Sequence, residues 1–465
     1  MLEIKKIFDS QQKNKASVAA CGPNQRKKKI QKLLNNFLSM EEEILSALAE
    51  DLGKSKTESL LAELYGVKTE AAFAIKNVGS WMRKKRVSSP LTIAFTKSWV
   101  KPEPVGSVLI ISPWNYPIML CLNPLIAAIA AGNTAVIKPS EYTPRSGEVV
   151  KKLVNMTFQE NEVAVILGEK DVAENLLDQP FNHIMFTGSP RVGKLVMSAA
   201  AKHLAGVTLE LGGKSPVIIN KDANIRDAAW KIAFYKFANA GQTCTAPDFV
   251  LCHDSVYDDF LKEIEKNIVE FFSGNISKGS KDYCSIAGAD HFDRLKGVLD
   301  DSILGGAKVA CGGYADRSSL FLSPTVLGDV EEKNPIMDEE IFGPLLPVLR
   351  FSDLNKAIDL INNRPKPLAL YLFSKSYSVQ NMVALSTSSG GFVINDCVIH
   401  HTNPHLPFGG INNSGLGSYH GKYGFDSFSH QKAIMKSSSL SPFKLMLPPY
   451  SKNKEWLASV IKRFL

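Results

Sequence analysis

The sequence predicts an α/β fold in which parallel sheets are covered by helices on both faces. Between residues 105 and 211, short apolar runs of strand length alternate with stretches of helical periodicity. Near-continuous apolar strands separated by helices are typical of such sheets. A similar alternation begins again after Gly212–Gly213. A chain of 465 residues is also too long for one hydrophobic core, so we expect two or three domains.

The first 85 residues are predicted to form helices. Ser39 followed by Glu42 has the spacing of a capping box. Ile44 and Leu48 then begin an apolar series with helical spacing. Residues 87–103 are instead extended, β-branched and bounded by prolines, which predicts a protruding hairpin.

Five apolar runs of strand length follow, and a helix over Ile118–Ala131 that ends at Gly132 lies between the first two. Parallel sheets bind ligands beyond the carboxyl ends of their strands. Asn115, Lys138, Gly188 and Glu210 each lie at or just after such an end, so we expect a ligand site there. The predicted strands are Ser107–Ile111, Thr134–Ile137, Val163–Leu167, His183–Phe186 and Val207–Leu211.

The second α/β region is predicted to contain a helix over Ile225–Ala238 and strands near residues 248–252 and 392–395. Beyond residue 436 the composition becomes loose, and the chain ends in a short amphipathic helix. Packing of its apolar face on the body or on a partner subunit is favoured over peripheral membrane contact. That face contains Trp456, Leu457, Val460, Ile461, Phe464 and Leu465.

Composition excludes several classes of protein. The 54 basic and 46 acidic residues leave a net charge of +8 that is spread along the chain, and no aromatic residues interleave with the basic runs, which argues against nucleic-acid binding. The seven scattered cysteines contain no C-x-x-C pair and favour a reducing compartment. The amino terminus has no apolar signal segment, so we expect a cytoplasmic protein.

No metal site is predicted. The adjacent pair His400–His401 should face opposite ways on a strand, and the other histidines lack ligand spacing.

Cys244 is the candidate nucleophile. It lies in the polar, glycine-containing segment Gly241–Pro247 (GQTCTAP), directly after a predicted helix. A lone cysteine is often only a small buried apolar residue, and these surroundings alone leave both interpretations open. A thiolate attacking an aldehyde would form a hemithioacetal, and loss of hydride would leave a thioester. Such chemistry also needs donors for the oxyanion and a base that activates water.

Asn115 and Glu210 can supply these two parts. Asn115, in the segment PWNYP, offers an amide donor beside the backbone N–H of Cys244, although it could also be a turn residue. Glu210 ends an apolar strand between Leu209 and Leu211, which should desolvate its carboxylate and raise its pKa toward that of a general base. The alternative for Glu210 is a salt-bridged strand end.

Two segments fit a dinucleotide. Phe186–Lys194 (FTGSPRVGK) follows a strand and opens a helix, so its backbone donors can face a pyrophosphate. It is not a P-loop, because Leu195 stands where the magnesium-binding Ser or Thr must be, and no G-x-G-x-x-G is present. Lys138 and Glu141 are three residues apart at a strand exit and could both bind a ribose diol, although such pairs are usually surface residues.

Taken together, these segments resemble the aldehyde dehydrogenase superfamily. The matching blocks occur in family order over residues 105–430, about seven tenths of the chain. The likeness is greatest to the class 3 branch, which is dimeric and acts on fatty or aromatic aldehydes, because of the short amino terminus and the segments GQTCTAPDFV and GSYHGKYGFDSFSHQKAIM. The blocks are PWNYP, IKPSE, FTGS with VGK, LELGGKSP, GQTC, EEIFGP and LPFGG-x-NNSGLG.

The resemblance implies a role for each candidate residue. Cys244 would be the nucleophile, Glu210 the general base and Asn115 the oxyanion donor. The remaining residues would bind NAD or NADP and the aldehyde. Pro190–Arg191 departs from the small residues that often follow FTGS, which leaves the choice between the two cofactors open. The assignments are Lys138 and Glu141 to the adenosine ribose, Gly188, Ser189 and Gly193 to the pyrophosphate, Glu340 to the nicotinamide ribose, and Tyr116 and Phe408 to the substrate tunnel.

The resemblance also implies a domain organisation and a homodimer. Residues 1–86 and 104–210 would form the NAD(P)-binding domain and residues 211–416 the catalytic domain. Residues 87–103 and 417–440 would form a small β arm for bridging and oligomerisation, and residues 441–465 a carboxy-terminal tail.

Two alternatives to aldehyde oxidation with hydrolysis remain. A coenzyme A-acylating dehydrogenase would have no need for a water-activating carboxylate at Glu210. A non-catalytic binding protein that keeps the fold would tolerate loss of Cys244, Glu210 or Asn115, and all three are present.

Overall fold

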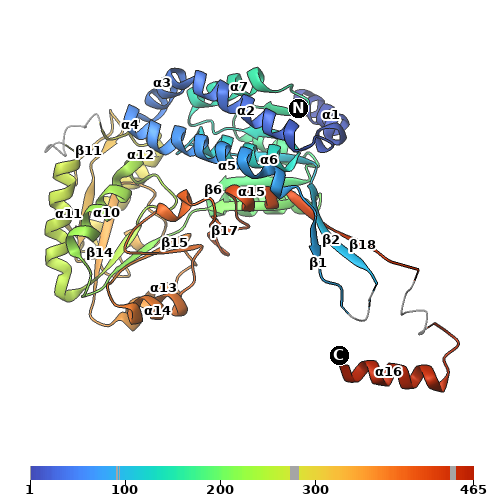
Figure 1. Cartoon of the computed structure of the whole chain (residues 1–465). Helices are drawn as coiled ribbons and strands as arrows, with labels where there is room; N and C mark the ends of the chain where they lie inside the picture. Colours follow the sequence, from blue (N-terminus) through green and yellow to red (C-terminus); the bar gives the residue numbers. More distant parts are fainter. Residues whose placement is uncertain (1, 91–92, 94, 273–281, 440–446, 465) are drawn as a thin grey trace.

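Two large sheets organise the chain in this computed structural model, and a small sheet of three strands projects from the first (Figure 1). The structure describes residues 2–90, 93, 95–272, 282–439 and 447–464. The α-helices are α1 (Leu2–Ala19), α2 (Pro23–Ser39), α3 (Glu41–Leu52), α4 (Lys56–Ser59), α5 (Tyr65–Trp81), α6 (Met119–Ala131), α7 (Pro144–Thr157), α8 (Lys170–Leu177), α9 (Pro190–Ala201), α10 (Ile225–Phe237), α11 (Tyr257–Phe271), α12 (Ala289–Leu304), α13 (Leu354–Asn362), α14 (Tyr377–Ser386), α15 (Gly421–Ser427) and α16 (Lys452–Phe464).

The first large sheet has six strands, and all of its pairings are parallel except that of the short edge strand β17 with β7. The predicted strands of this region are all found, with shifts of one or two residues at their ends. In spatial order the strands are β17 (Gly415–Leu416), β7 (Gly206–Leu211), β6 (His183–Gly188), β3 (Ser107–Ile111), β4 (Thr134–Lys138) and β5 (Val163–Val165).

Both faces of this sheet are covered, as the apolar strands predict. Every residue of the central strand β3 is buried. Val108 and Ile110 pack in a cluster with side chains of α2, α3, α5, α6 and α7, whereas Leu109 and Ile111 pack in a second cluster with side chains of α1, α8 and α9. Alternate side chains of one strand therefore enter two cores, and the predicted α/β class is confirmed.

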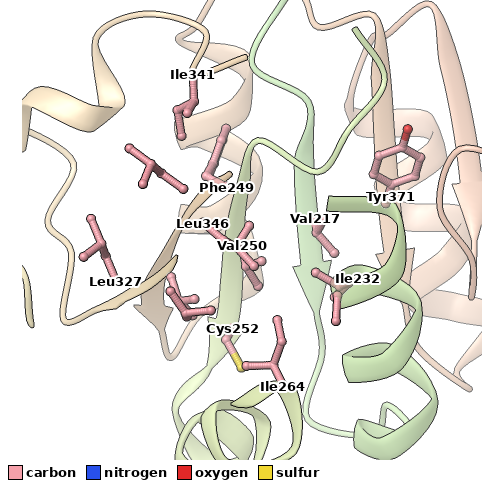
Figure 2. Close-up of a cluster of buried hydrophobic side chains, with 14 of the residues drawn as sticks. Val217, Ile232, Phe249, Val250, Cys252, Ile264, Leu327, Ile341, Leu346 and Tyr371 are labelled. Carbon is pink, nitrogen blue, oxygen red and sulfur yellow. The ribbon is translucent and has the colours of Figure 1, made fainter. Parts of the chain in front are cut away.

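The second large sheet has seven strands around its own core (Figure 2). All of its pairings are parallel except β10 with β13. Side chains such as Val250 of β9 and Ile232 of α10 fill this core. In spatial order the strands are β10 (Lys308–Cys311), β13 (Thr325–Gly328), β14 (Leu345–Phe351), β9 (Phe249–His253), β8 (Pro216–Ile219), β15 (Ala369–Phe373) and β16 (Gly391–Ile394), and a separate pair consists of β11 (Ala315–Asp316) and β12 (Phe321–Leu322).

The predicted hairpin is present as β1 (Lys85–Val87) and β2 (Lys97–Pro104), which pair antiparallel. Strand β18 (Ser429–Lys436), far away in the sequence, pairs with β2 along its whole length. In Figure 1 this three-stranded sheet extends away from the helices of the body.

The predicted helices of the first 85 residues are present, but the capping box is wrong. Ser39 is the last residue of α2, and its hydroxyl donates to the backbone oxygen of Asn36. The helix α3 begins after Met40 with no side-chain cap. Three glutamates in its first turn, beginning at Glu41, stabilise the helix dipole in place of a cap.

The amphipathic helix predicted at the carboxy terminus is α16. In Figure 1 its described residues stand clear of the body, and Trp456 is exposed. Packing on a partner subunit and contact with a membrane therefore both stay predictions. Within the described ranges, no helix combines the length and apolar character needed to cross a membrane.

Candidate active site

The candidate nucleophile, Cys244, lies in a tight loop that precedes strand β9 of the second sheet. The short helix η3 (Ala238–Gly241) separates α10 from this loop, and three successive residues there, Asn239, Ala240 and Gly241, have positive φ angles of 51°, 50° and 73°. A side chain on Gly241 would meet the backbone oxygen of Gly343 at 2.2 Å, so only glycine fits. The turn leaves Cys244 half-buried.

Both neighbours of Cys244 are held by tyrosines from different sheets. The hydroxyl of Tyr371, on β15, donates to the backbone oxygen of Thr245 over 2.5 Å. The hydroxyl of Tyr116, which follows β3, lies 2.7 Å from the hydroxyl of Thr243. The loop that carries the thiol is therefore fixed by the second sheet on one side and by the first sheet on the other.

Asn115 lies beside this loop. Its side-chain Nδ2 donates to the backbone oxygen of Gln242 over 2.9 Å. A carbonyl can only accept, so the nitrogen of the amide must face Gln242, and the second hydrogen on Nδ2 stays available for another acceptor. Gln242 lies two residues before Cys244, so the amide of Asn115 contacts the loop that carries the thiol.

Glu210 is enclosed in the first sheet. It lies on β7 between the edge strand β17 and β6, opposite Gly415 and Thr187. Its side chain is buried, and neither carboxylate oxygen has a hydrogen-bond partner. Burial raises the pKa of Glu210 well above its usual value, because a charged form is poorly stabilised away from water.

The electrostatics of Cys244 connect these groups. Burial is the main cause that raises the pKa of its thiol to about 12, and the negative charges of Glu340 and Glu210 raise it further. Both carboxylates therefore act on the sulfur. The structure brings Cys244, Asn115, Glu210 and Glu340 into one site, although they lie on four separate segments of the sequence.

This high pKa predicts how the protein reacts with an alkylating reagent. Only the thiolate reacts, so below the pKa its fraction rises about tenfold per pH unit. In a Cys21→Ala background, which removes the other cysteine that is not fully buried, alkylation of Cys244 by iodoacetamide should accelerate up to pH 10 without levelling off. Glu340→Gln should raise the rate at pH 8, because it removes a negative charge. A plateau below pH 9 would contradict this expectation.

Glu340 lies in a loop that is held by hydrogen bonds with residues just before strands β8 and β9 of the second sheet. Lys214 donates to Asp248 over 2.5 Å and to the backbone oxygen of Glu339 over 2.7 Å, and Asp248 accepts the backbone N–H of Ile341 over 2.9 Å. Burial and then the charge of Asp248 raise the pKa of Glu340 to about 8. The sequence analysis assigned no role to Lys214 or Asp248, although they lie in the blocks LELGGKSP and GQTCTAPDFV.

Gly212 gives this carboxylate its room. A Cβ on Gly212 would lie 1.9 Å from Oε2 of Glu340, whereas a Cβ on Gly213 would meet no atom closer than 3.4 Å. We expect Gly212→Ala to displace the carboxylate of Glu340 from the position in which the resemblance has it bind the nicotinamide ribose. The KM for NAD or NADP should then rise about tenfold or more, because a hydrogen bond to a charged group contributes about 1.5–3 kcal/mol. Gly213→Ala is the matched control and should change that KM less than about twofold. Equal effects of both variants would contradict the argument.

The predicted cofactor residues lie at the exits of β4 and β6. Lys138 is the last residue of β4 and forms an ion pair with Glu141. Ser189 caps α9, with its hydroxyl accepting from the N–H of Val192, and no acidic residue occupies the first turn of that helix. A helix amino terminus with no acidic residue in its first turn suits an anionic pyrophosphate.

The two predicted glycines permit close packing at this end of the sheet. A Cβ on Gly193 would lie 2.7 Å from a side-chain carbon of Leu211, so glycine lets the first turn of α9 approach β7. A Cβ on Gly188 would lie 2.6 Å from the ring of Phe186. These residues fit a dinucleotide bound at the carboxyl ends of the strands.

An aromatic cluster surrounds Phe408 on the other side of the site. Phe408 is buried and forms an antiparallel bridge with Tyr419, and their ring centroids are 5.8 Å apart. The charges of Glu210 and Cys244 both act on Tyr419, which therefore lies close to them. Tyr116 and Cys244 pack against the same hydrophobic cluster as Phe408. Sequence reasoning missed Tyr419, although it lies in the block GSYHGKYGF.

The prediction that His400–His401 lies on a strand is wrong. Both residues lie in the short helix η6 (Ile399–Thr402), and their rings lie 5.7 Å and 6.2 Å from that of Phe408. Among the residues that the structure describes, no group of three or more His, Cys, Asp or Glu side chains is placed to hold a metal ion.

Comparison with known proteins gives the family. Residues 2–434 match the Aldehyde dehydrogenase family. The 4,4'-diaponeurosporen-aldehyde dehydrogenase of Staphylococcus aureus is 44% identical over 99% of this chain and 98% of its own length. Aldehyde dehydrogenase family 3 member B1 of Homo sapiens is 43% identical over 90% of this chain and 89% of its own. The dimeric NADP-preferring aldehyde dehydrogenase of Rattus norvegicus is 42% identical over 90% and 91%.

Comparison with solved structures gives the same family. The substrate-bound state of Staphylococcus aureus AldH superimposes with a TM-score of 0.94 at 42% identity, over 98% of this chain and 99% of that one. PnpE from Pseudomonas sp. WBC-3 in complex with nicotinamide adenine dinucleotide has a TM-score of 0.85 at 26% identity, over 93% and 89%. The resemblance to the class 3 branch is thereby confirmed. The chain belongs to the aldehyde dehydrogenase family, as an oxidoreductase that converts aldehydes to acids with NAD or NADP.

Proposed function

We propose that this enzyme releases its acid product by hydrolysing a thioester formed on Cys244. One observation carries the proposal: Glu210 is buried without a hydrogen-bond partner on either oxygen, and its charge acts on Cys244. A buried carboxylate without a partner is costly, so it is kept for a function more often than for stability. A water molecule between Glu210 and a thioester on Cys244 would satisfy one of those oxygens.

In the first half of the reaction, the thiol of Cys244 releases its proton to solvent, and the resulting thiolate attacks the carbonyl carbon of the aldehyde. The carbonyl oxygen becomes an oxyanion, which accepts hydrogen bonds from the free hydrogen of Asn115 Nδ2 and from the backbone N–H of Cys244. When bound, NAD or NADP supplies the oxidised nicotinamide ring that accepts hydride. The carbon left on Cys244 is then at the oxidation level of a thioester.

In the second half, Glu210 takes a proton from water as the water attacks the thioester carbon. The same two donors stabilise the new oxyanion, which collapses with departure of the Cys244 thiolate and release of the carboxylic acid. The raised pKa of Glu210 suits this task, because the ionised form of a carboxyl group with a raised pKa is a stronger base than an ordinary carboxylate.

For the cofactor, we propose that Lys138 and Glu141 bind the adenosine ribose and that Glu340 binds the nicotinamide ribose. Gly188, Ser189 and Gly193 would lie along the pyrophosphate. The six-stranded sheet with residues 1–86 and 104–210 would then be the cofactor domain, and the second sheet would belong to the catalytic domain.

For the substrate, we propose medium- or long-chain aliphatic or aromatic aldehydes. The support is the apolar, aromatic wall of Tyr116, Phe408 and Tyr419 near the thiol. A relative named for 4,4'-diaponeurosporen-aldehyde also supports a large substrate. A homodimer, supported by the dimeric relative, and a cytoplasmic location stay predictions from the sequence.

Product analysis tests hydrolysis against acyl transfer to coenzyme A. With an aliphatic aldehyde and NAD or NADP, we expect one equivalent of free acid for each reduced cofactor. Added coenzyme A should leave both the rate and the product unchanged, because Glu210 activates water beside the thioester. Formation of an acyl-coenzyme A ester at a rate comparable to acid would overturn the proposal.

A further inference from the structure

A buried ion pair contacts the backbone of Asn115, the proposed oxyanion donor. Lys54 donates to Glu63 over 2.9 Å, and both side chains are 0% exposed. Lys54 also donates to the backbone oxygen of Asn115 over 2.7 Å. A buried charge pair contributes little net stability after the cost of removing both ions from water, so its retention calls for another reason.

Each partner of the pair is fully engaged. Besides Lys54, Glu63 accepts the backbone N–H groups of Ile118 and Met119 over 3.2 Å and 2.9 Å, where the helix α6 begins. The ammonium of Lys54 lies 4.2 Å from the ring centroid of Tyr116. Glu63 therefore fixes the segment after Asn115, and Lys54 fixes Asn115 and the ring that follows it.

Asn239 joins this pair to the loop of the nucleophile. Its side-chain Nδ2 donates to the backbone oxygen of Asn115 over 3.0 Å and to the backbone oxygen of Gln242 over 3.1 Å. The oxygen of Gln242 is also the acceptor of Asn115 Nδ2. Asn115, Gln242 and Asn239 are thus joined in a closed ring of hydrogen bonds, and Lys54 donates to the backbone oxygen of Asn115 in that ring.

The local fold explains how a lysine reaches this place. Gly53, with a φ of 66°, ends α3 in the left-handed conformation and turns the chain toward the site. Glu58, one turn further on, accepts the backbone N–H of Asn239 over 2.5 Å. The segment between α3 and η1 (Leu60–Leu64) therefore bonds both to the loop that carries Asn115 and to the loop that carries Cys244.

We propose that Lys54 is a positioning residue for the oxyanion site, which acts by holding the backbone of Asn115 so that its amide faces the substrate oxygen. The inference rests on the proposed role of Asn115. Without the bond from Lys54, the backbone oxygen of Asn115 keeps the bond from Asn239, and the segment that carries the amide is held less firmly, so the amide can shift relative to the substrate oxygen. A donor misplaced by about 1 Å can cost about 100-fold in rate.

The test is a double-mutant cycle on the full-length enzyme. We expect Lys54→Met and Asn115→Ala each to lower kcat/KM for the aldehyde, by about 10- to 100-fold and about 100- to 1000-fold respectively. The double variant should be no slower than Asn115→Ala alone, since Lys54 acts only through that amide. Lys54→Arg, which keeps a buried donor cation, should recover part of the lost rate.

Two further readouts separate positioning from general damage. The rate of Cys244 alkylation by iodoacetamide and the Kd for the cofactor should stay within about twofold of the parent enzyme in Lys54→Met, because neither depends on an oxyanion donor. Lys56→Met is the matched control, as Lys56 lies two residues away and its side chain is 62% exposed. It should leave kcat/KM unchanged.

A double variant that removes the charges of both Lys54 and Glu63 keeps the test possible if the single variant does not fold. If Lys54→Met fails to fold because Glu63 is left unpaired, Lys54→Met/Glu63→Gln keeps an acceptor for the N–H groups of Ile118 and Met119 without a buried charge, and the same cycle is measured on it. Unchanged turnover, effects that add to those of Asn115→Ala, or an equal loss of alkylation would each overturn the inference. Full activity of Asn115→Ala would instead remove the proposed role of Asn115 itself.

Discussion

Cys244→Ala is expected to abolish aldehyde oxidation, with a fall in kcat of at least about 10⁴-fold. Alanine cannot form the hemithioacetal, so no covalent intermediate is available from which hydride can leave. The remaining donors of the site cannot replace a nucleophile. Because Cys244 is half-buried at a loop and not in the centre of a core, we expect the variant to fold.

The measurement is steady-state production of reduced cofactor, together with cofactor binding by calorimetry. The Kd should stay within about threefold of the parent value, because the proposed contacts to the dinucleotide come from other residues. Cys21→Ala is the control, since Cys21 is the other cysteine that is not fully buried. If Cys244→Ala kept more than a trace of turnover, the thioester route would be wrong.

The five parallel strands of the first large sheet were predicted from the sequence, whereas in the second α/β region the prediction covered only the strands near residues 248–252 and 392–395. Strands such as β3 are buried on both faces, so nearly every residue in them must be apolar. Such a continuous apolar run can be recognised from the sequence alone. The ends of those strands then point to Asn115, Lys138 and Glu210. The blocks resembling the family placed Cys244, whose local signal alone left a buried apolar role open.

Tertiary context decided what the sequence left open. The capping box at Ser39 was wrong because α2 runs on through that residue. His400 was assigned to a strand from a local pattern that a turn of η6 overrides. Lys54 and Glu63 were overlooked because a charged residue in a helical region is usually solvated. The one available signal was that Glu63 interrupts the apolar run Leu60–Leu64.

The two sheets explain why the site needs both halves of the chain. Glu210 lies on a strand of the first sheet and Asn115 follows another strand of it. Cys244 and Glu340 instead belong to loops that bond to Tyr371 and Lys214 near the second sheet. Neither sheet alone carries the proposed nucleophile, the proposed oxyanion donor and the proposed base. A change that shifts the sheets relative to each other should therefore slow chemistry before it unfolds either core.

Glu210→Gln is expected to separate the two halves of the reaction. The side chain of glutamine has nearly the same shape as that of glutamate, with an NH2 group in place of one oxygen, but it cannot take a proton from water. Hydride transfer should continue, because it requires Cys244 and Asn115 and no base at this position. Thioester hydrolysis should slow by about 10²–10⁴-fold, the usual contribution of a general base. The enzyme then accumulates as the acyl thioester.

Rapid mixing of Glu210→Gln with aldehyde and NAD or NADP should give a burst of one reduced cofactor per active site, followed by a slow steady state. Hydroxylamine, which attacks a thioester without help from a base, should restore turnover and yield the hydroxamate. Glu42→Gln, at a side chain that is 80% exposed, is the control and should show no burst. In the parent enzyme, the steady rate should rise with pH through a pKa well above that of an ordinary carboxyl, because burial disfavours the ionised base. Loss of the burst in Glu210→Gln would mean that Glu210 deprotonates the thiol of Cys244 and not the water.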